Sequence, residues 1–63
     1  MNASSEQSTA IKVARYVEAR QWVRSWHTAM WACIRAGFSA RANDCRKKVE
    51  EWEAEAARLE RLL

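Results

Sequence analysis

The chain lacks proline altogether and holds a single glycine, Gly37, among its 63 residues. These are the two residues that most disfavour a helix interior, and the remaining composition is dominated by Ala, Arg, Glu and other helix formers. The sequence therefore predicts an all-α protein. Because one glycine cannot build a glycine-rich phosphate loop, that class of nucleotide site is excluded as well.

Long apolar runs are also absent. The longest, Ala29–Ile34, is far shorter than a membrane-spanning helix. Residues 1–9 have neither the basic start nor the apolar stretch of a secretory signal. We therefore expect a cytoplasmic protein, in the host cytoplasm if a phage or plasmid encodes it, with Cys33 and Cys45 as reduced thiols.

Groups suited to catalysis or metal binding are sparse. His27 is the only histidine, and neither Ser25 nor Cys33 lies three or four residues away, where a nucleophile and its base would share a helical face. No CxxC or HxxxH motif exists for a structural zinc ion. The sequence predicts no enzyme, no cofactor and no metal site.

A first helix is predicted over about residues 8–36. Ser4 and Gln7 have the spacing of a capping box, which predicts a helix start between Ser4 and Ser8. Residues 1–7 are expected to form a flexible polar segment. Beyond residue 36, Gly37 suits a left-handed helix cap.

The turn is predicted over 37–39, with Ser39 as the N-cap of a second helix over about 40–63. Apolar residues follow a three- and four-residue spacing in both segments, but with different phases. The first register comprises Tyr16, Ala19, Val23, Trp26, Met30 and Cys33, and the second comprises Phe38, Ala42, Cys45, Val49, Trp52, Ala56, Leu59 and Leu63. The change of phase predicts an antiparallel helical hairpin rather than one straight helix.

The first helix carries more apolar surface than one partner helix can cover. Such patches are rarely left in water, which predicts a homo-oligomeric helical bundle. A two-fold dimer of four helices is the simplest form, and higher even-numbered assemblies stay open. The surplus residues are Ile11, Ala14, Trp22 and Ala29 on one flank and Val13, Val17 and Trp31 on the other.

Charge is distributed unevenly along the chain. Residues 10–48 hold nine Lys/Arg against two acids, whereas residues 49–63 hold five Glu against two Arg. The turn end therefore becomes a basic pole that suits phosphate groups. The alternative is a solvated cap held by helical pairs such as Arg46 with Glu50 and Lys47 with Glu51.

Aromatic rings alternate with arginines between Val13 and Arg35. Flat rings beside guanidinium groups favour an anionic, aromatic ligand of nucleotide type. For Trp22 and Trp31 an oligomer interface is favoured somewhat over a ligand, because tryptophan is enriched at interfaces, whereas Trp26 and Trp52 fall on the two registers and are predicted core residues. The candidate ligand residues are Trp31, Trp22 and Tyr16 for base stacking and Arg35, Arg41, Arg24 and Arg20 for phosphate contact.

Two short segments resemble known families. Thr9–Val17 (TAIKVARYV) resembles the start of the first helix of the Rop family, helical-hairpin dimers of plasmids that bind paired RNA loops through their first helices. That resemblance implies RNA contact by Tyr16, flanked by Lys12 and Arg20.

The second segment, Ala29–Phe38 (AMWACIRAGF), resembles the helical-hairpin signature of phage sponges that sequester cyclic-nucleotide immune messengers. Those proteins are small helical oligomers that hold nucleotides with aromatic and basic side chains. The resemblance implies base stacking by Trp31 and phosphate contact by Arg35, although here a further helix follows the signature.

The sequence thus predicts a non-catalytic helical oligomer that binds and sequesters an anionic nucleotide-type ligand, as a phage counter-defence protein would. Two alternatives stay open: an inhibitor that docks its apolar tryptophan face on a host protein, and a Rop-like RNA-binding regulator. A membrane partner is not expected, because the Glu-rich second helix would bring negative charge to an anionic lipid surface.

Overall fold

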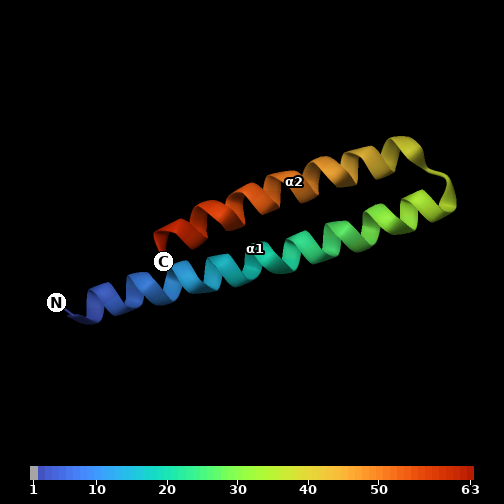
Figure 1. Ribbon diagram of the computed structural model, residues 1–63. Helices are drawn as coiled ribbons and strands as arrows, with labels where there is room; N and C mark the ends of the chain where they lie inside the picture. The colour runs from blue at the N-terminus through green and yellow to red at the C-terminus, as the bar shows by residue number, and fades with distance from the viewer. Residues whose placement is uncertain (1) are drawn as a thin grey trace.

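The computed structural model describes residues 2–63, with side chains from Ser8 onward. Two helices, α1 (Asn2–Ala36) and α2 (Ser39–Leu62), run antiparallel along each other (Figure 1). The described chain contains no strand, and it measures 54 × 14 × 10 Å. The predicted all-α helical hairpin is confirmed. In neither described helix is there a stretch long and apolar enough to cross a membrane.

The start of α1 differs from the prediction. The helix begins at Asn2 instead of at about residue 8, so it includes most of the segment predicted to precede it. Residues 2–8 contain no proline or glycine, and nothing in their backbone stops the helix from continuing toward the N-terminus. The capping box of Ser4 and Gln7 lies outside the described side chains.

The turn is built by Gly37. Its φ angle is +81°, its N–H donates to the Ile34 carbonyl at 3.1 Å, and the Phe38 N–H donates to the Cys33 carbonyl at 2.8 Å. These two bonds are those of a Schellman motif, with glycine at the left-handed position. The predicted left-handed cap is confirmed.

The predicted cap of α2 is wrong. Phe38 is the N-cap, its carbonyl accepts the Ala42 N–H at 2.9 Å, and no side chain caps the helix. Ser39 is already the first residue of α2. The Schellman motif leaves Phe38 in position to start the next helix at once, so the turn contains two residues instead of the predicted 37–39.

Gly37→Ala is expected to lower the free energy of unfolding by about 1–2 kcal/mol, since a residue with a Cβ is disfavoured at positive φ. An added Cβ would meet nothing within 4 Å, so the loss is a backbone effect alone. Gly37→Asn should lose less, because asparagine tolerates the left-handed region better. Urea denaturation, followed by circular dichroism at one fixed protein concentration, measures the free energy of unfolding of both variants. Equal midpoints for the parent and both variants would contradict this reading of the turn.

The core lies along the seam between the helices, and both predicted registers face it. A central cluster joins Ala19 to Ala56 and Leu59, with Tyr16 and Trp52 packed against it. The register residues at the ends, Phe38 and Leu63, stay 55% exposed because they lie at the turn and at the chain end. The buried apolar residues are Ala19, Val23, Ala42, Cys45, Val49, Ala56 and Leu59.

Candidate ligand-binding groove

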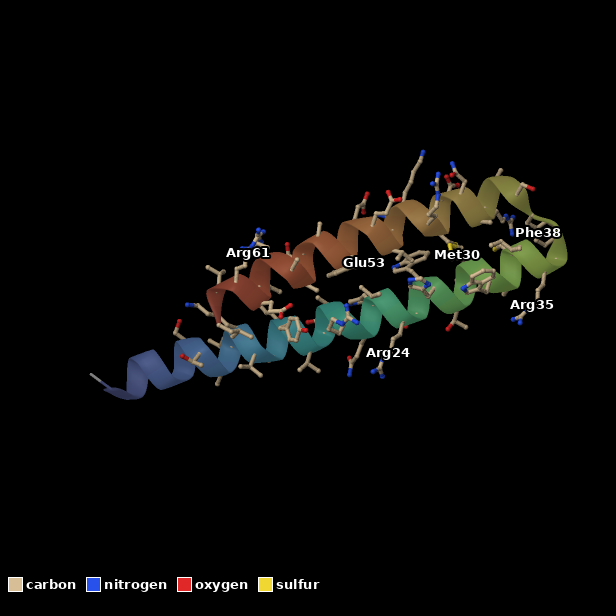
Figure 2. All side chains as sticks on the ribbon, in the orientation of Figure 1. Arg24, Met30, Arg35, Phe38, Glu53 and Arg61 are labelled. Atoms are coloured by element: carbon tan, nitrogen blue, oxygen red, sulfur yellow. The ribbon has the colours of Figure 1, made fainter. Side chains whose placement is uncertain are left out.

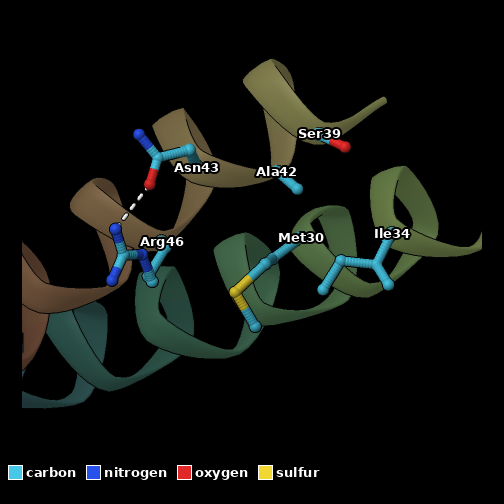
Figure 3. A pocket seen from close by; sticks show the side chains of 6 residues that line it. All are labelled: Met30, Ile34, Ser39, Ala42, Asn43 and Arg46. Atoms are coloured by element: carbon cyan, nitrogen blue, oxygen red, sulfur yellow. Dashed lines mark hydrogen bonds between the residues drawn. The ribbon is translucent and has the colours of Figure 1, made fainter. Parts of the chain in front are cut away.

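A groove of about 310 Å³ opens between the helices next to the turn. Figure 3 shows α1 contributing two apolar side chains and α2 contributing one small and three polar ones. Met30, Ile34 and Ala42 make the groove apolar on one side, while the opposite rim offers a hydroxyl, an amide and a guanidinium. The six lining residues are Met30, Ile34, Ser39, Ala42, Asn43 and Arg46.

Arg46, at the rim of the groove, is held by a neighbour on its own helix. Its Nη2 donates a hydrogen bond to Asn43 Oδ1, three residues earlier (Figure 3). A guanidinium has five N–H donors, so this bond leaves others for an anion. Arg46 and Glu50, a pair that the solvated-cap alternative offered, form no ion pair in the described part of the chain.

The other pair of that alternative, Lys47 with Glu51, is replaced by a neighbouring one. Lys48 approaches Glu51, with Nζ and Oε2 3.4 Å apart. Both residues of this pair are well exposed, so it contributes little to stability. Lys47 has no ion-pair partner among the residues that the structure describes.

A further contact crosses the seam between the two helices. His27 Nε2 on α1 lies 3.6 Å from Glu53 Oε1 on α2. His27 and Ile34 are seven residues apart, as are Arg46 and Glu53, so each pair lies on one helical face. The contact therefore lies on the same side of the hairpin as the groove.

None of the sequence-predicted ligand residues lines the groove, and Trp31 and Arg35 each follow one of its lining residues, Met30 and Ile34, directly in the sequence of α1. Trp31 is three residues from Ile34 and therefore its neighbour on the surface of α1. Its ring is 54% exposed. Arg35, one turn further, projects from α1 away from α2 (Figure 2). Among the described residues neither has an ion-pair or ring partner, so both are available to a ligand.

Three other predicted ligand residues contact their own hairpin. The Trp22 ring stacks on Trp52, with centroids 5.8 Å apart and planes at 17°. Tyr16 packs against the central core cluster. The Arg41 guanidinium lies 5.7 Å from the centre of the Phe38 ring, a cation–π contact at the turn. The structure thus does not bring these three together with Trp31.

Arg20 and Arg24 lie on the exposed surface of α1. Arg24 projects away from α2 in Figure 2, as Arg35 does. Neither Arg20 nor Arg24 is paired with a carboxylate in the described part of the chain. Since residues 19–43 contain no Asp or Glu, this surface has a strong excess of positive charge.

Carboxylates concentrate at the other end of the hairpin, where some are paired. Glu55 accepts two hydrogen bonds from Arg58, and these lower the pKa of the Glu55 carboxyl. Burial opposes that shift, while the charges of Arg58 and Arg15 lower the pKa further. Arg15 belongs to α1, so the acidic part of α2 lies near an arginine of the other helix.

The two cysteines are free thiols on facing helices. Burial raises the pKa of the Cys45 thiol, and the neighbouring Cys33 thiol and Asp44 carboxylate raise it further. A raised pKa keeps the thiol protonated and unreactive at neutral pH. In the described part of the chain, no three His, Cys, Asp or Glu side chains gather into a group able to hold a metal ion.

No family model, curated protein or solved structure matches this chain. The resemblances to Rop and to the phage sponges therefore stay predictions, and the site has to be argued from its own residues. Sequence reasoning did not assign the groove. It placed Met30 in the core and Arg46 in the basic pole, and it gave Asn43 no role. The three-residue spacing of Asn43 and Arg46 was the one sequence signal that could have indicated this side-chain pair.

Proposed function

We propose that this chain is a non-catalytic binding protein that takes up an anionic, aromatic ligand of nucleotide type in the groove beside the turn. The observation that carries this proposal is the pairing of an apolar surface with a guanidinium that Asn43 orients. Apolar contacts with a few placed polar groups are the usual make-up of a small-molecule site.

The chemistry of the groove favours a defined pose. A planar base would lie against Met30 and Ile34, with the exposed Trp31 ring beside it, and stacking of this kind is worth about 1–3 kcal/mol per base. The phosphate would accept charge-assisted hydrogen bonds from Arg46, with Arg35 adding positive charge from the neighbouring face of α1. A volume of about 310 Å³ is at the lower end for ligand pockets, which favours a single nucleotide unit.

We further propose that the protein acts as a homo-oligomer and sequesters its ligand stoichiometrically. The surroundings of His27 favour binding without turnover. His27 faces Glu53, and no nucleophilic side chain lies three or four residues away from it in the sequence. Binding without turnover removes a ligand only in proportion to protein concentration, as a sponge does.

A second candidate function is inhibition of a host protein by the apolar surface of α1. The observation that favours it is the exposure of Ile11, Val13 and Val17, which lie far from the groove. The affinity for a partner bound there would not change when residues of the groove are substituted. A third candidate function is RNA recognition by the arginines of α1 that have no carboxylate partner among the described residues. It predicts that the protein binds duplex or looped RNA more tightly than a mononucleotide.

Native mass spectrometry of untagged protein, purified gently from cells, tests the proposal in one spectrum. We expect an even-numbered oligomer that carries a discrete nucleotide-sized mass, because the groove would retain its ligand. Trp31→Ala and Arg35→Ala, made separately, should each reduce that retained mass. If both variants kept the oligomeric state and bound every nucleotide and RNA tested as tightly as the parent, the proposal would be wrong.

A further inference from the structure

One face of α1 is unlike the rest of its exposed surface. Residues spaced by three or four positions form a single stripe along the helix. The stripe is Ile11, Ala14, Glu18, Trp22, Ser25, Ala29, Ala32 and Ala36. All of these residues are exposed except Ala29, which is half-buried. The stripe has one charged side chain, Glu18. The face of α1 that carries Trp31 has three arginines, Arg20, Arg24 and Arg35, and no acidic residue.

The hairpin is elongated, 54 × 14 × 10 Å, and it exposes 5041 Å² of surface, against about 4,200 Å² for a compact protein of this mass. A long, thin hairpin has this excess through its shape, and its length gives room for the roughly 800 Å² that one partner contributes to a standard protein interface. We infer that a second copy of the chain docks on the stripe, with its α1 antiparallel to the first and the two-fold axis near Ser25.

Shape favours the antiparallel arrangement. With the axis at Ser25, Ala14 of one copy lies opposite Ala36 of the other, and Glu18 lies opposite Ala32. The large Trp22 ring then lies beside the small Ala29 of the second copy, so the two larger side chains near the axis, Trp22 and Glu18, each meet an alanine. A parallel arrangement would instead oppose the two Trp22 rings.

Charge favours the same arrangement. The half of the hairpin next to the turn, residues 25–49, has five Lys/Arg and one Asp, which gives +4. The whole chain carries +3, so the remaining residues carry −1. A parallel dimer would place two +4 halves side by side, whereas an antiparallel dimer places each +4 half beside a −1 half. The docked copy leaves the groove and the unpaired arginines of α1 open.

The inference rests on the proposed self-association but not on the proposed ligand. Ala32 tests it, because the antiparallel arrangement brings Glu18 of the second copy opposite this position. We expect Ala32→Lys to tighten the dimer about three- to tenfold by forming two symmetric ion pairs. Ala32→Glu should weaken the dimer by at least as much. Ala54→Lys and Ala54→Glu, at an exposed mid-helix alanine of α2, are the matched controls and should change the dissociation constant less than about twofold.

Sedimentation equilibrium over a range of concentrations gives the dissociation constant of each variant. If Ala32→Lys and Ala32→Glu both weakened the dimer, the inference would be overturned. In a parallel dimer residue 32 of one copy faces residue 32 of the other, so either substitution would place two like charges together. A parent chain that stays monomeric, or Ala32 variants that behave as the Ala54 controls do, would overturn it too. AMP titrations of the same variants separate the two proposals, because Ala32 lies outside the groove and should leave the AMP affinity unchanged.

Discussion

Replacing Trp52 by alanine is expected to lower the free energy of unfolding by about 3 kcal/mol. Trp52 packs against the central cluster of Ala19, Ala56 and Leu59, and it also stacks on Trp22. Tryptophan-to-alanine changes in a core lower the free energy of unfolding by about 3–5 kcal/mol. Trp52 is half-buried, so the lower end of that range applies. A domain of this length has roughly 3–9 kcal/mol of stability in total, so even that loss removes a large part of it.

Urea denaturation followed by circular dichroism at one protein concentration measures the effect. Trp31→Ala is the matched control: it deletes the same side chain from an exposed position with no ring partner among the described residues, and should leave the midpoint nearly unchanged. Trp22→Ala should fall between the two, since it removes the stacking contact but leaves the core cluster intact. A Trp52→Ala protein with the parent midpoint would show that the seam is not packed as described.

Charge reversal at Arg46 is expected to reduce nucleotide affinity about 10- to 100-fold. The loss corresponds to a charge-assisted hydrogen bond worth about 1.5–3 kcal/mol. Arg46→Lys should recover part of the affinity, because the charge stays while the fork of donors held by Asn43 is lost. Isothermal titration with AMP gives the dissociation constants directly.

Lys47→Glu is the matched control for the reversal at Arg46. It changes the net charge by the same amount at the next residue, but Lys47 does not line the groove. Long-range effects of an exposed charge are screened at physiological salt, so we expect less than about a threefold change. Equal losses from Arg46→Glu and Lys47→Glu would mean that AMP responds only to overall charge and that the groove is not its site.

The hairpin could be predicted from sequence because its two causes are local. Three- and four-residue spacing of apolar residues is a direct consequence of helix geometry, and the phase change at Gly37 requires a turn. The positive φ of Gly37 confirmed the cap that a lone glycine predicted. The cap at Ser39 failed because the second helix starts as soon as Phe38 leaves the Schellman motif, which depends on backbone geometry that residue types do not specify.

The candidate site was predictable only in part, for a different reason. Exposure of Trp31 and Arg35 follows from their position off the apolar register. The groove depends on distances between two helices, and on the small Ala42 being placed near Met30 and Ile34. Side-chain pairing was equally hard to foresee, since Arg46 had acceptors at three and at four residues and bonded to the amide at three. Trp22 was predicted to be available to an interface or a ligand, but it stacks on Trp52 of the other helix.

The central claim, that the groove beside the turn binds a nucleotide-type ligand, is tested most directly by NMR. Amide and methyl spectra of isotope-labelled protein would be recorded during a titration with AMP, and with ribose 5-phosphate as the probe that lacks a base. We predict saturable shifts at Met30, Ile34, Ala42 and Arg46 with AMP, and weaker binding of ribose 5-phosphate at the same residues. Shifts confined to Arg20 and Arg24, or no saturable shifts with either compound, would contradict the account.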